Sequence, residues 1–305
     1  MAVRRKPIPC ATGPGSVPEW FSSAITEAGH ELVDISQAEA LFWYHGGSST
    51  LGDLLEAGSR LQWVQLPAAG IESYLPYLDP RLIWTCAKGV YADPVAEHAL
   101  ALALAGMRGT AHYGRQQSWS EPRGVSLFDA NVTILGGGGI GQALVDLLRP
   151  FRVEPLLVRR NPRPEQANEV ALDQLHEVLP TSDLVILALA LTPETAGVIG
   201  ERELRLMAPH AWLVNVSRGR HVVTEDLVRA LREGWIGGAA LDVTDPEPLP
   251  NGHELWTLDD CLITPHIGNT PEMNRPLLRA FTMRNLRHRA AAEPLEGLVD
   301  PALGY

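Results

Sequence analysis

Cysteine, net positive charge and long hydrophobic runs are all scarce in this sequence. The 305 residues include three cysteines, Cys10, Cys86 and Cys261, which lie far apart and show no Cys-x-x-Cys spacing. This pattern argues against a disulfide framework or a zinc site, because both need cysteines in pairs. We therefore expect free thiols in a reducing compartment and no bound metal.

The charge balance and the short apolar runs restrict the partners. A formal net charge of −11 leaves no global basic field that could hold nucleic acid or an anionic membrane. The longest apolar runs, residues 99–107 and 184–191, are far shorter than the roughly 18 residues that cross a bilayer. No apolar stretch of signal-peptide length follows the charged start. We expect a cytoplasmic protein without a nucleic-acid or membrane partner.

Short apolar strands alternate with amphipathic stretches across residues 130–270. One helix is indicated by Leu227, Ala230 and Leu231, with Gly234 as its stop signal. Continuous apolar strands with helices between them are typical of a parallel sheet covered on both faces, so the predicted fold class is α/β. The strands are expected at 132–135, 156–158, 184–187, 212–216, 239–243 and 262–263.

The first ninety residues show the same pattern more weakly, with strands predicted at 63–66 and 82–85 and a helix at 51–57. We expect a separate, smaller α/β lobe here. A long apolar helix follows over residues 95–107, with Asp93-Pro94 supplying its N-cap and its first helical residue. Its apolar surface is expected to be buried between the lobes or against a second subunit, which favours a homodimer.

A glycine turn follows the first strand of the second lobe. The strand at 132–135 runs into Gly136-Gly137-Gly138-Gly139-Ile140-Gly141, and a helix follows. This is G-x-G-x-x-G in the context that a dinucleotide site requires, with Gly136 for the tight turn, Gly138 for close approach of a pyrophosphate and Gly141 for helix packing. Free amides at the helix start would hold the phosphates. The alternative is a glycine loop without a ligand.

Arginines replace the acidic residue that dinucleotide folds usually carry about 20 residues past the glycine motif. The strand at 156–158 ends in Arg159-Arg160-Asn161-Pro162-Arg163. A carboxylate would repel a ribose 2′-phosphate, whereas guanidinium groups bind it through paired, charge-assisted hydrogen bonds. The sequence favours NADP(H), with NAD(H) possible. The competing interpretation is a solvated basic turn.

Three further polar residues follow predicted strands, where ligands of open parallel sheets bind. Arg218, Glu247 and His266 each come after a different strand and are expected to point into one crevice. An arginine binds a carboxylate, a histidine transfers a proton, and a carboxylate orients the imidazole. This set is suited to the reduction of a 2-oxo acid.

Taken together and in order, these motifs resemble the D-isomer specific 2-hydroxyacid dehydrogenase family. Residues 159–164 and 242–250 most resemble its NADPH-using glyoxylate/hydroxypyruvate reductases. The resemblance covers most of the chain and is carried by Val95–Leu100, the glycine motif, Leu191–Thr195, Asn215–Gly219, Ala240–Val243, Glu247-Pro248 and Pro265–Gly268.

The resemblance implies a role for each matching position. Arg218 would anchor the substrate carboxylate and carbonyl, His266 would act as the acid/base and Glu247 as its partner. Backbone amides at Ala69 and Gly70 would donate hydrogen bonds to the substrate carboxylate. The cofactor would be bound by Gly136, Gly138, Gly139, Ile140, Gly141, Arg159, Arg160, Thr195, Val216, Ser217, Asp242 and Gly268, with Asp242 on the nicotinamide carboxamide.

The resemblance also implies two Rossmann-like lobes with the active site between them. Residues 1–94 and 273–305 would form a smaller, flavodoxin-like substrate domain, to which the chain returns at its end. Residues 95–272 would form the dinucleotide-binding domain, with a doubly wound parallel sheet.

Other functions and other histidines stay open at this point. One alternative is an NAD-dependent dehydrogenase of the phosphoglycerate type, and another is a non-catalytic protein that senses nicotinamide cofactors. His45 is another titrating group that could line the substrate pocket, but a solvated loop histidine is the simpler interpretation. His98, on the apolar helix, is expected to be a packed core residue.

Overall fold

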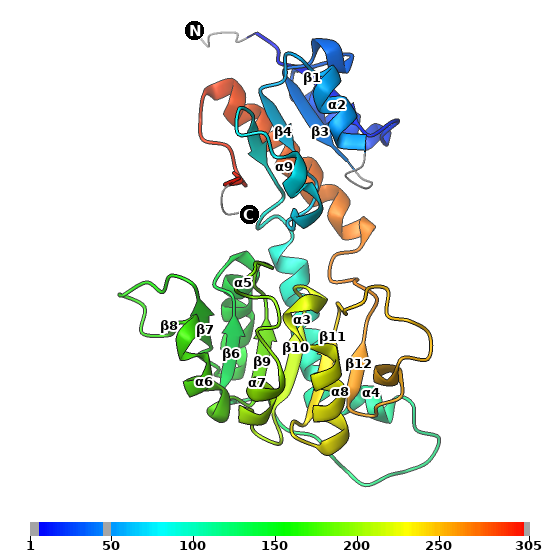
Figure 1. Cartoon of the computed structure of the whole chain (residues 1–305), viewed down its shortest axis with the longest axis vertical. Coiled ribbons are helices and arrows are strands. Elements are labelled where there is room, and N and C mark those ends of the chain that lie inside the picture. Colours follow the sequence, from blue (N-terminus) through cyan, green and yellow to red (C-terminus); the bar gives the residue numbers. More distant parts are fainter. Residues whose placement is uncertain (1–5, 45–49, 302–305) are drawn as a thin grey trace. The chain divides into compact units, whose positions relative to one another are not determined.

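The computed structural model describes residues 6–44 and 50–301, which fold as two units (Figure 1). One unit takes the described parts of Met1–Tyr91 and Pro271–Tyr305, and the other is Ala92–Thr270. Both junctions coincide with the first residue of a helix. The domain limits expected from the sequence, after residues 94 and 272, fall three and two residues later. His45 lies outside the described residues.

The first unit is built on a five-stranded parallel sheet in the order β2-β1-β3-β4-β5. This is the 2-1-3-4-5 order of flavodoxin-like doubly wound folds. Its strands are β1 (Pro9–Gly13), β2 (Glu31–Leu32), β3 (Ala40–Trp43), β4 (Trp63–Gln65) and β5 (Ile83–Thr85). Its helices are α1 (Glu19–Glu27), η1 (Ile35–Gln37), α2 (Leu51–Ala57), η3 (Glu72–Tyr77) and α9 (Pro271–Ala291).

Helix α9 returns to this sheet through a buried polar network. Gln65, at the end of β4, donates to the Thr282 hydroxyl at 2.9 Å and accepts from the Asn285 amide at 3.0 Å. All three side chains are buried, and Asn285 also accepts from the backbone of Glu296 at 2.8 Å. Because buried polar groups need partners, these bonds fix α9 in one register against β4.

The second unit holds a seven-stranded parallel sheet in the order β12-β11-β10-β9-β6-β7-β8, which Figure 1 shows nearly face-on. Numbered within the unit, this is 7-6-5-4-1-2-3, the Rossmann order extended by one strand. Its strands are β6 (Val132–Leu135), β7 (Leu156–Arg159), β8 (Glu169–Ala171), β9 (Leu184–Leu187), β10 (Trp212–Asn215), β11 (Gly238–Leu241) and β12 (Cys261–Ile263). Its helices are α3 (Ala92–Met107), α4 (Thr110–Tyr113), α5 (Gly139–Leu148), η4 (Arg149–Phe151), η5 (Leu172–Gln174), α6 (Leu175–Val178), η6 (Leu179–Thr181), α7 (Glu201–Leu206), η7 (Gly219–His221), α8 (Thr224–Glu233) and η8 (Glu254–Trp256).

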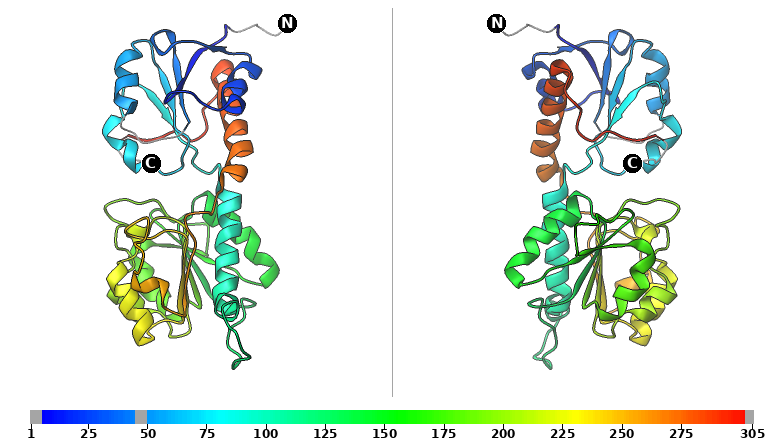
Figure 2. Two further views of the ribbon diagram at one scale, coloured as in Figure 1. Left: turned by 90° about the vertical axis from the view of Figure 1, so that its right-hand side faces the viewer. Right: turned by 90° about the vertical axis from the view of Figure 1, so that its left-hand side faces the viewer.

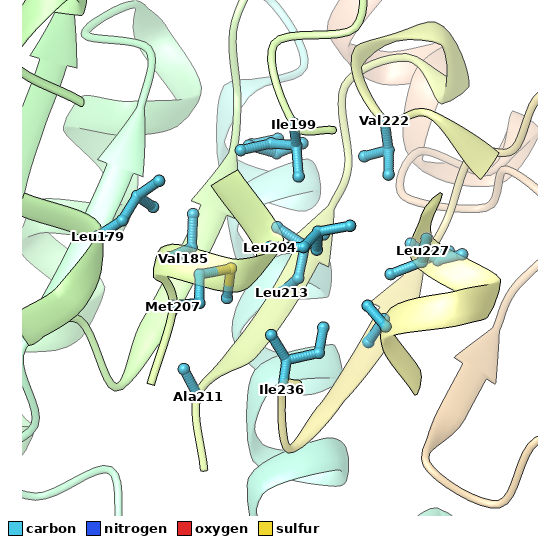
Figure 3. Packing of buried hydrophobic residues seen from close by; sticks show 14 of the residues in the cluster. Leu179, Val185, Ile199, Leu204, Met207, Ala211, Leu213, Val222, Leu227 and Ile236 are labelled. Atoms are coloured by element: carbon cyan, nitrogen blue, oxygen red, sulfur yellow. The ribbon is translucent and has the colours of Figure 1, made fainter. Parts of the chain in front are cut away.

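Alternate residues of the central strands face opposite layers of helices. In β9, Val185 and Leu187 pack with residues of α7 and α8, among them Leu204 and Leu227, as Figure 3 shows for part of this cluster. Leu184 and Ile186 face the other side and pack with α3 and α5. Figure 2 shows these two helices together on one side of the sheet. The predicted doubly wound α/β fold is therefore confirmed.

Helix α3 begins at Ala92, which corrects the prediction that Asp93 is its N-cap. Pro94 is instead inside the first turn, where a missing N–H costs no hydrogen bond because those amides have no acceptor within the helix. Farther along, a Cβ added at Gly106 would lie 2.3 Å from the Trp212 ring, so α3 packs closely on β10. No helix among the described residues is long and apolar enough to span a membrane.

The packing predicts a site-dependent cost for shortening leucine. Leu213, in the centre of β10, is fully buried, so Leu213→Ala should lower the free energy of unfolding by about 2–5 kcal/mol. Leu147 on α5 is 36% exposed, and Leu147→Ala should cost less than about 1 kcal/mol. Urea denaturation of both variants measures the difference. Equal losses would contradict this account of the core.

Candidate active site

The glycine turn joins β6 to α5 in the geometry that its sequence predicts. Gly136 has φ +122°, and a Cβ there would lie 2.2 Å from the carbonyl oxygen of Ala188 at the end of β9. A Cβ at Gly141 would lie 2.0 Å from the Gly136 carbonyl oxygen. Both positions therefore exclude a side chain. At Gly136 the positive φ and the contact with β9 exclude it, and at Gly141 the close contact between the helix and the turn does.

Gly138 is different, because a Cβ added there would meet nothing within 4 Å. The space beside it is open, and α5 begins at the next residue, Gly139. Since β6 lies between β7 and β9, the turn also sits where the strand order reverses. An open backbone at a helix start and at a switch point fits the pyrophosphate of a dinucleotide.

The arginines at the end of β7 are paired with two acidic residues that sequence reasoning missed. Arg159 Nη1 donates to Glu169 Oε1 at 2.9 Å, and Arg163 Nε donates to the same oxygen at 2.9 Å. Arg160 Nη2 lies 3.1 Å from Glu194 Oε2 on the surface. The acid absent from the end of β7 thus has a counterpart on β8, which lies next to it in the sheet.

Glu169 is ionised under all ordinary conditions. Its side chain is fully buried. The hydrogen bonds from the Arg163 side chain, helped by those from the Arg163 backbone and from Arg159, overcome the opposing effect of burial and lower the pKa of Glu169 to about 2. Its carboxylate therefore neutralises one of the two positive charges that it contacts.

Arg218, Glu247 and His266 follow the carboxyl ends of β10, β11 and β12, three successive strands of the sheet. In parallel strands these ends lie at the same edge, so the fold places the three loops in a row. His266 Nδ1 and Glu247 Oε1 are 2.6 Å apart, and both side chains are about half exposed. The structure thus brings this pair into direct contact and places Arg218 in the loop after β10, the strand next to β11.

His266 has an unusual backbone conformation, with φ +54°. Non-glycine residues rarely adopt this region, and such residues concentrate at functional sites. Its backbone N–H donates to the carbonyl oxygens of Asp242 at 2.8 Å and Thr264 at 3.0 Å. These bonds hold the strained residue in place.

The Arg218 backbone is held by buried polar side chains. Asn215 Nδ2 donates to the Arg218 carbonyl oxygen at 2.9 Å, and the Asn215 amide oxygen accepts from the Ser217 hydroxyl at 2.9 Å. His221 Nδ1 lies 2.9 Å from that hydroxyl and 3.1 Å from the Arg218 carbonyl oxygen. His221 is fully buried, and no motif in the sequence points to it, because its partners are other loop residues.

The side chain of Asp242 holds the loop that carries His266 through several hydrogen bonds. Its Oδ1 accepts from the Thr264 hydroxyl at 2.6 Å and from the backbone N–H of Ile267 at 2.9 Å, while Oδ2 accepts from that of Gly268 at 2.9 Å. His98 Nε2 lies 3.2 Å from Oδ1. His98 is thus a hydrogen-bonded partner of Asp242, which corrects the prediction of a packed core residue.

Burial of Asp242 acts to raise its pKa. The hydrogen bonds from His98 and Thr264, together with the two backbone amides, outweigh burial and lower the pKa to about 2. The carboxylate is therefore ionised, and its negative charge holds the loop closed around it.

The remaining predicted site residues lie in loops that follow strands, except Ile140, which lies in the first turn of α5. The Thr195 hydroxyl donates to the Ala190 carbonyl oxygen at 2.8 Å and so closes the turn after β9. Val216 and Ser217 are buried, and Ile140 packs in the core formed by α3 and α5.

Ala69 and Gly70 belong to the first unit and follow β4. The neighbouring Ala68 carbonyl oxygen accepts from the Ala87 N–H at 3.0 Å, which fixes this loop.

The pKa of Asp242 predicts how its replacement changes stability with pH. A pKa lowered from 3.8 to about 2 stabilises the fold above the unfolded value, and this stabilisation is lost as pH falls through about 2. Asp242→Asn should therefore be less stable than the wild type by about 2 kcal/mol at pH 7, with a gap that narrows as pH falls from 5 toward 2. Urea denaturation across this range measures the gap, and Asp173→Asn, at an exposed position, is the control. A gap that does not change with pH would contradict the assignment.

Comparison with known proteins identifies the family. Residues 98–268 match the model of the D-isomer specific 2-hydroxyacid dehydrogenase NAD binding domain. The chain is 40% identical over 298 residues to an uncharacterized protein in the proB 3′ region of Corynebacterium melassecola, which covers 94% of this chain and 97% of that protein. It is 38% identical over 211 residues to the glyoxylate reductase of Pyrococcus furiosus, covering 65% of this chain and 62% of that enzyme.

A solved structure shows the same fold over nearly all of the chain. The D-isomer specific 2-hydroxyacid dehydrogenase from Xanthobacter autotrophicus Py2, in complex with NADPH and MES, superposes with a TM-score of 0.85 at 25% identity, covering 98% of this chain and 100% of that one. The family match spans more than half of the chain, and it coincides with the unit that contains the glycine turn and the His266–Glu247 pair. The chain belongs to the D-isomer specific 2-hydroxyacid dehydrogenase family and is an NAD(P)-dependent oxidoreductase.

Proposed function

We propose that this protein reduces a small 2-oxo acid, such as glyoxylate or hydroxypyruvate, to the D-2-hydroxy acid, with NADPH as the preferred cofactor. The observation that carries the proposal is the 2.6 Å contact between His266 and Glu247, at the edge of the sheet that also carries Arg218. A histidine paired with a carboxylate beside a guanidinium provides a proton and an anchor for a carboxylate substrate. The name of the Pyrococcus relative supports glyoxylate as a substrate.

The proposed cofactor site uses the open backbone at Gly138 and the start of α5 for the pyrophosphate. The flanking residues Gly136, Gly139, Ile140 and Gly141 shape this turn. Arg159 and Arg160 would face the ribose 2′-phosphate, and the NADPH named for the Xanthobacter structure supports that preference. Thr195, Val216, Ser217, Asp242 and Gly268 would line the rest, with Asp242 toward the carboxamide.

The chemistry divides between cofactor and protein. When bound, a reduced nicotinamide supplies a hydride for the carbonyl carbon of the substrate. Arg218 would bind the substrate carboxylate and polarise the carbonyl group, together with the backbone amides of Ala69 and Gly70. Protonated His266 would give its proton to the carbonyl oxygen as the C–H bond forms, which yields the hydroxy acid. Glu247 would orient the imidazole and stabilise its positive charge.

The first experiment compares cofactors and substrates with the wild-type protein. The absorbance of NADPH and, separately, of NADH is followed with glyoxylate, hydroxypyruvate, pyruvate, phenylpyruvate and branched 2-oxo acids. We expect rapid oxidation of NADPH with a small 2-oxo acid and a lower kcat/KM with NADH. Binding of a cofactor without turnover of any acid would favour the sensing protein, and oxidation of a phosphorylated hydroxy acid with NAD would favour the phosphoglycerate type.

Replacement of the histidine tests its role. His266→Asn suits the left-handed backbone there and removes the titrating group, so kcat should fall by about 10²–10⁴-fold while NADPH binding is retained. His253→Asn is the matched control, because His253 caps the short helix η8 and asparagine also serves as an N-cap. Steady-state kinetics and a fluorescence titration with NADPH measure both. Near-normal turnover of His266→Asn would refute the assignment.

The homodimer and the cytoplasmic location remain predictions.

A further inference from the structure

Glu169 makes a set of contacts that belongs neither to the glycine motif nor to the His266 loop. It is the first residue of β8 and lies opposite Leu157 in the register of β7 and β8. Side chains two residues apart on a strand share a face, so Arg159 projects from the same face as Glu169. The pairing of β7 with β8 therefore brings Glu169 next to Arg159 and holds it beside the residues that end β7.

The Glu169 carboxylate binds two arginines at once. Oε1 accepts from Arg159 Nη1 at 2.9 Å and from both Nε and Nη2 of Arg163, and Oε2 accepts from the Arg163 backbone N–H at 2.7 Å. The carboxylate is fully buried, whereas the Arg159 and Arg163 side chains are 27% and 44% exposed. The cluster therefore keeps a net charge of +1 and presents its positive groups to solvent.

Arg159 also lies against the glycine turn. A Cβ added at Gly137 would be 3.1 Å from both Cδ and Nε of Arg159. The ordered guanidinium is thus next to the backbone that would hold the pyrophosphate. In a dinucleotide site of this type the adenosine ribose lies near the end of the second strand, which here is β7.

We propose that Glu169 is a positioning residue that sets cofactor selectivity, because it holds Arg159 and Arg163 as a preformed cation pair for a ribose 2′-phosphate. Without the carboxylate, two like charges repel each other and two long side chains rotate freely. A phosphate would then have to order them on binding, which weakens its affinity. The inference rests on the proposed function for the identity of the ligand.

The test is the effect of Glu169→Gln on the binding of NADP⁺ and NAD⁺, measured by isothermal titration calorimetry. Glutamine keeps the side-chain length and one acceptor oxygen but removes the charge. The preference for NADP⁺ over NAD⁺ should fall about tenfold, the size expected when a charge-assisted contact is weakened. The loss should come from NADP⁺, with the Kd of NAD⁺ unchanged.

The control is Asp129→Asn, which removes another carboxylate paired with an arginine, Arg152, before the start of β6. Asp129 has φ +61°, which asparagine tolerates, so both Kd values should stay as in the wild type. Thermal melting shows whether each variant is folded. If Glu169→Gln does not fold, Arg163→Gln replaces it, because this variant leaves Glu169 paired with Arg159. It should also lower the NADP⁺ preference selectively.

The outcomes separate the inference from the proposed function. Equal weakening of both cofactors would show that Glu169 is only structural, and a stronger NADP⁺ preference would show that its charge repels the phosphate. Either result overturns the inference, as does an unchanged ratio in a wild type that prefers NADP⁺. A wild type that prefers NAD⁺ would overturn the inference together with the proposed cofactor preference, while the activity assay would still test the reductase.

Discussion

The conformation of the loop that carries His266 depends on the hydrogen bonds to the buried carboxylate of Asp242. Its two oxygens take hydrogen bonds from Thr264, Ile267 and Gly268 and contact His98 of α3. A carboxylate in this position is costly unless donors surround it, and the donors come from the loop itself and from the helix beneath it. Closing the loop around the charge keeps His266 in a left-handed conformation. The position of the His266 imidazole thus follows from the hydrogen bonds that the buried Asp242 carboxylate requires.

Much of the fold could be predicted from the sequence because its signals are local. The strand at 132–135, the helix at 51–57 and the end of α8 at Gly234 all lie where the apolar pattern and the stop signal place them. The glycine turn was predictable for the same reason, since its conformation and close contacts exclude side chains at Gly136 and Gly141. The predicted start of α3 was wrong, because proline is tolerated throughout the first turn of a helix and does not fix where the helix begins.

Pairings between distant residues could not be predicted, since they depend on the order of the strands. His98 and Asp242 are 144 residues apart and meet only after α3 has packed on the sheet that carries β11. Glu169 is close to Arg159 in sequence, but their contact depends on the register of β7 with β8. A pattern of residue types shows that arginines are present. It does not show which carboxylate holds them, and that carboxylate decides how ordered their charges are.

The network that joins α9 to β4 has a consequence for synthesis of the chain. The second unit is one continuous stretch, Ala92–Thr270, and all of its strands are translated before α9 is made. The first unit is discontinuous, so Gln65 lacks its buried partners until Thr282 and Asn285 emerge. The unit whose strands are translated first is therefore the one completed last. A nascent chain would carry the five strands of the first unit without α9, while its second unit is already translated in full.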